Sequence, residues 1–330
     1  MKILRPGLLT TVQDLGRNGH QQDGVSVGGA MDAPALRIAN LLVGNPEGAA
    51  GLEITLLGPT IEFTRDTLIA ITGAHLTPTI DQQPVPDARP VLVRTGAALA
   101  FGECKAGCRA YLAVAGGVDV PIVLGGRGTY LRAHFGGLEG RALRAGDTVP
   151  VGPGSSEALR IADTLAPTPG TFAATSWGIS ASALPSYTDT RAVRVLAGSH
   201  FRLFDDGSRR RFVGEPFGVT PQSDRMGYRL EGPGLALASP LEPISEPVCA
   251  GSVQVPPEGQ PIVLMADRQT TGGYPRIGQV ITVDLPRVAQ TRAGESLRFV
   301  EVSLEEAERL YAERERTIAQ VKQGLVNAAH

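Results

Sequence analysis

The chain has 330 residues, of which 42% are hydrophobic and 19% are charged, and its formal net charge is −2 at pH 7. This balance is typical of a folded globular protein, excludes an intrinsically disordered chain and gives no electrostatic basis for binding nucleic acid. Since single hydrophobic cores rarely grow beyond about 250–300 residues, the length favours two domains or one large domain.

Targeting segments and metal sites are not evident in the sequence. Residues 1–14 lack the apolar stretch of a secretory signal, and no segment has the roughly 18 uninterrupted apolar residues of a membrane helix, so we expect a cytoplasmic protein. Three cysteines and five dispersed histidines form neither a disulfide framework nor a zinc pattern. We therefore expect reduced structural thiols and no metal.

Short apolar runs recur along the chain, each bounded by Gly, Pro, Asp or Asn. They are rich in Val, Ile, Thr and Leu, and 41 glycines and 25 prolines interrupt them. This pattern predicts short strands joined by turns, which usually close into barrels or sandwiches. The clearest runs are GLEITLL, TLIAITG, AYLAVAGG, AVRVLAG, PIVLMA, QVITVDL and SLRFVEVS.

Two segments have helical patterns instead. Residues 31–45 begin with Asp32 as the N-cap and Pro34 in the first turn, and they end at Gly44. Residues 303–324 begin with a capping box of Ser303 and Glu306, present one apolar face and end at Gly324, ahead of a frayed tail.

Two further segments have neither pattern. The basic cluster at residues 208–212, SRRRF, is interpreted as a solvated hairpin loop without function. The stretch between residues 163 and 191 is dominated by Ala, Thr, Ser and Pro and indicates a connection. We therefore predict a first β-rich domain at residues 1–165, a linker at 166–190 and a second β-rich domain with the C-terminal helix at 191–330.

Common catalytic motifs are absent from the sequence. There is no P-loop, no G-x-S-x-G or H-E-x-x-H motif, and no lysine between two methionines to carry biotin. The glycine-rich residues 125–140 could bind an anion through backbone N–H groups, but they lack the strand and helix of a Rossmann motif. A flexible loop is the plainer interpretation.

The densest polar cluster is MADRQTTGGYPRIGQV at residues 265–280, directly after an apolar run. An arginine fork can bind a carboxylate and the neighbouring amides and hydroxyls can bind a carbonyl compound, while nearby carboxylates could orient water or move a proton. The alternative is an internal salt bridge between Asp267 and Arg268 that holds a barrel end. The candidate binding residues here are Arg268, Gln269, Thr270, Thr271, Gly272, Gly273 and Tyr274; the candidate carboxylates are Glu53, Asp224 and Glu246.

Several long motifs together resemble the biotin-dependent carboxyltransferase family, which includes the 5-oxoprolinase C subunit, also called KipA, the antagonist of the kinase inhibitor KipI. They are PGLLTTVQDLGRNGHQQDGVSVGGAMD, LEITLLGP, YLAVAGGVDVP, SDRMGYRLEGP, ISEPVCAGSVQVPPEGQPIVLMADRQTTGGYPRIGQVI and VSLEEA. Related domains occur in urea amidolyase, urea carboxylase and allophanate hydrolase subunit 2. The resemblance implies a mainly β fold of two cyclophilin-like β-barrel subdomains with few helices.

The resemblance also implies a function and partners. Such a chain would work with a KipI-like B subunit, together with a LamB/YcsF-like A subunit, in the ATP-dependent hydrolysis of 5-oxo-L-proline to L-glutamate. It would carry no covalently bound cofactor, and whether ATP contacts this chain is left open. The alternatives are a regulatory protein that antagonises a KipI-like inhibitor and a urea- or allophanate-type carboxyltransferase or amidolyase component.

Site residues follow from the same resemblance. Arg268 or Arg225 would hold the substrate carboxylate, and Gln254, Gln269 and Thr270 would bind the lactam. Asp267, Asp224 and Glu53 are the candidate catalytic residues, with Glu246 among the binding residues. One loop departs from the family pattern: Gly126 and Gly128 stand where serines are usual, and His134 where a small residue is usual, which puts in doubt a role for hydroxyls there.

Overall fold

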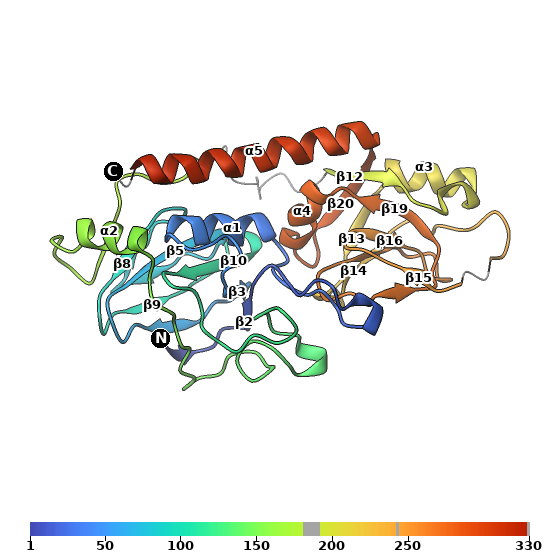
Figure 1. Cartoon of the computed structure of the whole chain (residues 1–330). Helices are drawn as coiled ribbons and strands as arrows, with labels where there is room; N and C mark the ends of the chain where they lie inside the picture. Colours follow the sequence, from blue (N-terminus) through green and yellow to red (C-terminus); the bar gives the residue numbers. More distant parts are fainter. Residues whose placement is uncertain (181–191, 242–243, 329–330) are drawn as a thin grey trace. The chain divides into compact units, whose positions relative to one another are not determined.

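The computed structural model describes residues 1–180, 192–241 and 244–328, which divide into two compact units (Figure 1). Unit 1 comprises residues 1–17, 28–180 and 317–328, and unit 2 comprises residues 18–27, 192–241 and 244–316. The predicted mainly β fold with few helices and a C-terminal helix is confirmed.

Unit 1 contains two antiparallel sheets around one apolar core, to which Ile3, Ile54, Phe63 and Ile71 contribute. The five-stranded sheet has the order β1 (Lys2–Arg5), β4 (Thr60–Glu62), β9 (Ala98–Ala100), β6 (Thr79–Ile80) and β7 (Gln83–Pro84). The six-stranded sheet has the order β11 (Phe172–Ala174), β8 (Val91–Val93), β5 (Thr67–His75), β10 (Ala106–Val114), β3 (Gly51–Thr55) and β2 (Leu9–Gln13). Its edge strand β2 leads directly into the polar motif at residues 13–17.

Helix α1 (Ala33–Leu42) lies against β5 and β10 (Figure 1) and confirms the helix predicted at residues 31–45. Its N-cap is Asp32, whose Oδ1 accepts a hydrogen bond from the backbone N–H of Ala35 at 3.0 Å. Buried Ile38 and Leu42 pack into an apolar cluster on the sheet. The capping and spacing seen in the sequence thus position this helix correctly.

Helix α2 (Ser156–Leu165) was not anticipated, although its start has a recognisable cap. Ser155 Oγ accepts a hydrogen bond from Ala158 N at 3.1 Å, and Ile161 and Leu165 are buried. Strand β11 falls inside the predicted linker, because Phe172–Ala174 pairs with β8 instead of running free. Residues 181–190 of the predicted linker lie outside the described residues.

Unit 2 contains a closed barrel whose core includes buried Val195, Phe217, Val253 and Phe299. Strands β12 and β20 pair in parallel and the other neighbours pair antiparallel. The strand order is β12 (Ala192–Ala197), β19 (Arg276–Val280), β16 (Ser252–Gln254), β17 (Ile262–Leu264), β14 (Gly227–Glu231), β13 (Pro216–Val219) and β20 (Ser296–Glu301). A separate two-stranded ribbon joins β15 (Glu246–Pro247) to β18 (Thr271–Gly272).

The hairpin loop predicted at residues 208–212 is wrong, because these residues belong to helix α3 (Asp206–Gly214). Asp205 caps the helix by accepting a hydrogen bond from Ser208 N at 2.6 Å. Phe212 is fully buried and stacks on Phe299 at a centroid distance of 4.7 Å. One buried aromatic side chain therefore fixes a helix whose remaining residues are mostly polar.

Helix α5 (Leu304–Ala328) begins where the capping box predicted, with Glu306 N donating to Ser303 Oγ at 3.2 Å. The predicted end at Gly324 is wrong, since the helix continues through it to Ala328. One glycine costs a helix only about 1 kcal/mol, which a helix of 25 residues absorbs. The remaining helices are α4 (Leu285–Gln290) and the short 3-10 turns at Gln21–Asp23, Leu131–Ala133, Phe201–Leu203 and Thr282–Asp284.

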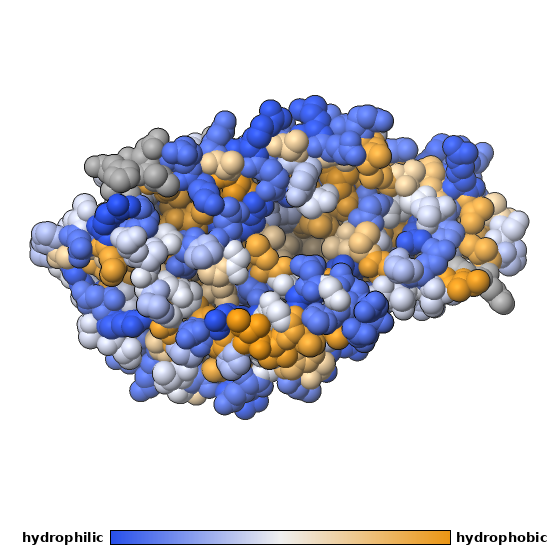
Figure 2. All heavy atoms as spheres, viewed as in Figure 1, coloured by the Kyte–Doolittle hydropathy of each residue, from blue (hydrophilic) through white to orange (hydrophobic). Residues whose placement is uncertain are grey.

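Surface hydropathy varies across the face in Figure 2, where apolar residues gather in patches among hydrophilic ones. Leu8, Leu57 and Ile122 of unit 1 are among the exposed large apolar residues. None of the helices in the described part of the chain is long and apolar enough to cross a membrane.

Candidate functional site

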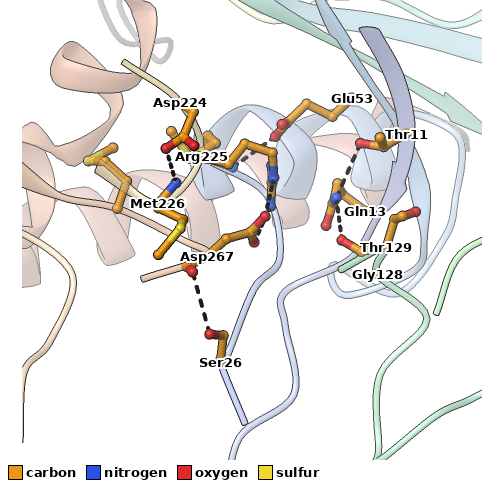
Figure 3. A network of polar contacts seen from close by, with 12 residues as sticks. Thr11, Gln13, Ser26, Glu53, Gly128, Thr129, Asp224, Arg225, Met226 and Asp267 are labelled. Atoms are coloured by element: carbon orange, nitrogen blue, oxygen red, sulfur yellow. Dashed lines mark hydrogen bonds and ion pairs between the residues drawn. The ribbon is translucent and has the colours of Figure 1, made fainter. Parts of the chain in front are cut away.

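The loop that follows β17 is anchored by a buried ion pair in unit 2. Asp267 accepts two hydrogen bonds from Arg225, from Nε to Oδ2 and from Nη2 to Oδ1, both at 2.9 Å (Figure 3). The two side chains are nearly inaccessible, with residue exposures of 3% and 5%. The expected salt bridge between Asp267 and Arg268 is therefore wrong: the partner is Arg225, 42 residues away, and the pair fixes where the loop begins.

Ser26 also holds this loop. Its hydroxyl donates to the backbone oxygen of Arg268 at 2.7 Å. It also lies 3.4 Å from the backbone oxygen of Asp267, the contact drawn in Figure 3. The serine lies in the motif PGLLTTVQDLGRNGHQQDGVSVGGAMD, and the sequence analysis did not name it as a site residue. A side chain this far from the loop in sequence gives no local signal of the contact.

Arg268 differs from Arg225 because its guanidinium has only neutral partners. Its Nε and Nη1 donate to the carbonyl oxygens of Val248 at 3.4 Å and Met265 at 3.3 Å. Within the described residues, no carboxylate lies within ion-pair distance of it. Burial lowers the pKa of the Arg268 guanidinium, and the nearby Cys249 thiol partly opposes this shift. A partly buried cation with weak neutral partners is suited to bind an anionic ligand.

A row of polar side chains lies on β16 and β19 next to this loop. Ser252 and Gln254 share one face of β16, and the Val253 side chain between them is buried in the barrel core. Ser252 Oγ donates to Gln279 Oε1 at 3.0 Å, and the exposed Cys249 thiol donates to the same oxygen at 3.3 Å. The sequence interpretation treated Cys249 as a purely structural thiol and did not name Ser252 or Gln279.

Gln254 has an unsatisfied amide group in this row. It is only 1% exposed, its Oε1 accepts a long hydrogen bond from Gln269 Nε2 at 3.5 Å, and its Nε2 has no partner among the residues that the structure describes. Gly272 lies against it, since a Cβ there would approach Gln254 Nε2 to 2.5 Å. The structure thus brings together Gln254, Gln269 and Gly272 around an amide group with one unpartnered atom, and their role in binding stays a prediction.

The other predicted residues of the loop lie further along the ribbon of β15 and β18. Glu246 forms an ion pair with Arg276. The Thr270 carbonyl oxygen accepts a hydrogen bond from Val248 N at 3.0 Å. Thr271 and Tyr274 are exposed, and Gly273 is partly buried between them. Glu246 is thereby committed to a neighbouring arginine in this structure.

Asp224 has a structural explanation in the turn that leads into β14. Its Oδ1 accepts hydrogen bonds from the backbone N–H groups of Met226 at 2.8 Å and Gly227 at 3.2 Å (Figure 3). The residue is exposed. This is the Asx turn that aspartate favours, and its catalytic role stays a prediction.

Glu53 belongs to unit 1, where it is buried beneath the start of α1. Its Oε2 accepts hydrogen bonds from Met31 N and from the Tyr111 hydroxyl, both at 2.8 Å, and Asp32 N donates to that hydroxyl at 2.7 Å. Burial, followed by the Glu53 and Asp32 carboxylates, raises the pKa of Tyr111 well above its ordinary value. This network ties α1 to the sheet, and catalysis by Glu53 stays a prediction.

The loop that departs from the family pattern also lies in unit 1. Gly126 and Gly128 stand close to Asp14, where a Cβ on either would come within 3.0 to 3.3 Å of the carboxylate. His134 is exposed and has a left-handed backbone with φ of 54°.

Two other features of the described residues offer no further candidate site. A cavity of about 360 Å³ opens beside α2, where Arg94 on its rim is paired with Asp66 at 3.0 Å and Arg65 donates to the carbonyl oxygens of Val151 and Gly152. No group of three or more His, Cys, Asp or Glu in the described residues is arranged to hold a metal ion.

The two β-rich units and the motifs on them define a carboxyltransferase domain. Residues 23–301 match the family described as carboxyltransferase domain, subdomain A and B, and the chain belongs to this family. It is 42% identical to the 5-oxoprolinase C subunit of Escherichia coli (strain K12), an alignment that covers 99% of both chains. It is 40% identical to the 5-oxoprolinase C subunit of Haemophilus influenzae, over 94% of both.

A solved structure has the same fold over nearly the whole chain. The crystal structure of the K. lactis urea amidolyase superimposes with a TM-score of 0.87 at 29% identity, covering 97% of this chain. The chain spans only 20% of that much longer protein. The family resemblance inferred from the sequence motifs is confirmed by these findings.

Proposed function

We propose that this chain is the C subunit of a 5-oxoprolinase that hydrolyses 5-oxo-L-proline to L-glutamate with ATP in the cytoplasm. Its partners are a KipI-like B subunit, together with a LamB/YcsF-like A subunit. The 42% identity to a 5-oxoprolinase C subunit over 99% of both chains supports this assignment. The observation in the structure that carries it is the open amide group of Gln254, next to Gln269 and Gly272.

The substrate matches these groups chemically. 5-Oxoproline has one carboxylate and one lactam, so an amide side chain can pair with the lactam while a cation binds the carboxylate. Arg268 is the cation that we assign to the carboxylate, because in the described structure its guanidinium contacts only carbonyl oxygens. Asp267 has a positioning role instead, since its carboxylate is engaged by Arg225.

An unactivated lactam is a poor electrophile, which explains the need for ATP. Transfer of the γ-phosphoryl group to the lactam oxygen releases ADP and makes the ring carbon electrophilic. Water then adds to that carbon, the C–N bond breaks, and the resulting acyl phosphate is hydrolysed by a second water. Donors already aimed at the developing oxyanion lower such barriers, a role we assign to the backbone of Gly272 and Gly273.

A carboxyltransferase that acts on a urea-type substrate is the second candidate. The TM-score of 0.87 to the K. lactis urea amidolyase favours it. The identity is lower, at 29%, and a biotin carboxylase would have to be supplied by another chain. We rank this function below the first.

The test is 5-oxoproline-dependent ATP hydrolysis by the purified chain, alone and with its candidate A and B subunits. Turnover only in the full mixture is the expected result. Absence of turnover in every mixture, with the KipI-like partner still bound, would instead support a regulatory or urea-type member. In the active complex, Arg268→Ala should raise the KM for 5-oxoproline about tenfold or more; an unchanged KM would remove Arg268 from the site.

A further inference from the structure

Ser26 links a segment near the start of the sequence to the loop that contains Arg268. Residues 18–27 belong to unit 2, although the residues on both sides of them belong to unit 1. Ser26 is only 2% exposed, and its hydroxyl donates to the Arg268 carbonyl oxygen at 2.7 Å. Because a hydroxyl has one hydrogen to donate, this bond takes precedence over the longer contact with the Asp267 carbonyl oxygen, at 3.4 Å (Figure 3).

Backbone bonds within unit 2 hold the loop on either side of Arg268. Just before it, Asp267 N donates to the Arg225 carbonyl oxygen at 2.8 Å. Just after it, the chain enters β18, which pairs with β15. Between these two points the Ser26 hydroxyl holds the carbonyl oxygen of Arg268 itself. The serine therefore fixes the backbone at the residue whose side chain is the candidate cation.

The guanidinium of Arg268 has only weak contacts of its own. Its bonds to two carbonyl oxygens are 3.4 and 3.3 Å long, beyond the usual range of about 2.7–3.2 Å. Contacts this long do little to hold a side chain that has several rotatable bonds. The position of the guanidinium therefore depends on where the backbone of Arg268 is held.

We propose that Ser26 is a positioning residue, which places the Arg268 guanidinium where it binds the carboxylate of the substrate. The inference rests on the proposed function, in which Arg268 is the cation for that carboxylate. Ser26 acts through the backbone of Arg268, so its contribution is confined to ligands that have a carboxylate. It thereby adds to the selectivity for 5-oxoproline over a plain lactam.

The probes are 5-oxo-L-proline and 2-pyrrolidinone, the same lactam ring without the carboxylate. In the assembled complex of the full chain with the A and B subunits, we would measure kcat and KM for the first and the inhibition constant of the second. The variants are Ser26→Ala, Arg268→Ala and the double variant. The matched control is Ser208→Ala, which removes another buried hydroxyl of unit 2, one that accepts from Ala236 N at 2.8 Å.

Ser26→Ala should raise the KM for 5-oxoproline about fivefold and leave kcat nearly unchanged, because a carboxylate remote from the reacting bond is bound equally in the ground and transition states. The inhibition constant of 2-pyrrolidinone should not change. In the Arg268→Ala background the same substitution should have no effect on KM, since the group through which Ser26 acts is gone. Ser208→Ala should retain the wild-type KM.

Two results would overturn the inference. One is an increase in KM by Ser26→Ala that persists without Arg268, and the other is equal weakening of both lactams, since either would show a purely structural role. If the alanine variant does not fold, Ser26→Cys replaces it, because a thiol has nearly the same size and is a weaker donor. The same outcomes then decide.

The proposed function can fail separately. If the wild-type complex shows no 5-oxoproline-dependent turnover, the rate at which phenylglyoxal modifies Arg268 in the full chain, located by mass spectrometry, decides whether Ser26 sets the position of this guanidinium. Ser26→Ala should raise that rate about threefold or more, because the released loop exposes the side chain. Ser208→Ala should leave it unchanged. Equal rates in wild type and Ser26→Ala would overturn the inference.

Discussion

Gln13 in unit 1 and Gln254 in unit 2 are both buried, and each has one amide atom without a partner among the described residues. They differ in what holds the amide. Gln13 bonds to a carbonyl oxygen, which accepts only, whereas Gln254 bonds to the amide of Gln269. If the side-chain amides of Gln254 and Gln269 both rotate by 180°, the hydrogen bond between them is kept. The unpartnered atom of Gln254 then becomes the oxygen, an acceptor, instead of the nitrogen, a donor. Gln13 therefore presents a fixed acceptor, whereas the Gln254 pair can present either a donor or an acceptor.

Both open amides contrast with the ionisable groups around them. The carboxylates of Asp267 and Glu53 are engaged by strong donors, namely Arg225 in one case and the Tyr111 hydroxyl in the other. Buried groups that are fully engaged stabilise the fold, and those left open are positions where a ligand can complete the bonding. Substitutions of the first kind should change stability, and substitutions of the second kind should change binding.

The largest effect on stability is expected from Asp267→Ala. Removing one partner of a buried ion pair costs about 3 kcal/mol or more, because the guanidinium of Arg225 loses its bidentate carboxylate. Denaturant unfolding of the purified chain measures this. The control Glu313→Ala removes an exposed pair with Arg309, which solvent screens, and should change stability far less. Similar losses in the two variants would contradict the structural role of Asp267.

A smaller loss of unfolding free energy, about 2 kcal/mol, is expected from Tyr111→Phe, because Asp32 N loses its acceptor and the Glu53 carboxylate loses a donor. The raised pKa of Tyr111 also predicts a pH dependence. Above about pH 10 the unfolded chain ionises this hydroxyl while the folded chain keeps it neutral, so stability falls as pH rises. The phenylalanine variant should lack that part of the slope in unfolding free energies measured between about pH 9 and pH 11; an identical slope would show that Tyr111 contributes nothing to it.

The smallest effect is expected from Gly128→Ser. A Cβ there would lie 2.9 Å from Gln13 Oε1 and 3.0 Å from Asp14 Oδ1, closer than ordinary contact, so the neighbouring side chains must shift and the chain should lose about 1 kcal/mol of stability. Gly48→Ser is the matched control, because a Cβ there meets only Leu15 at ordinary contact distance. A melting temperature lowered only by Gly128→Ser would confirm the close packing around Gly128, and equal shifts would contradict it.

The sequence was most informative where local patterns decide the structure. The caps at Asp32 and Ser303 located the starts of α1 and α5. The cluster after PIVLM identified the loop that contains Arg268 and Gln269, because a polar run directly after a buried strand is visible without knowing the fold. Helix α3 was missed since its charged residues conceal Phe212, the one fully buried apolar side chain of the helix.

Pairings between distant residues could not be predicted in the same way. Asp267 has an adjacent arginine in the sequence, yet it pairs with Arg225 because backbone bonds such as Asp267 N to Arg225 O, at 2.8 Å, bring those segments together. The open atom of Gln13 depends on Thr129, 116 residues away, and on the missing side chain of Gly128. The residue types of the candidate site were visible in the sequence, and their partners required the structure.

The most direct test of the account is the kcat/KM for 5-oxoproline of the assembled complex that contains Gln254→Met, measured against wild type with the unfolding free energy of each chain. Methionine preserves the size of the side chain and removes the open amide. We predict a loss of kcat/KM of about tenfold or more, with stability changed by about 1 kcal/mol or less. An unchanged kcat/KM would contradict the claim that the open amide group of Gln254 binds the substrate.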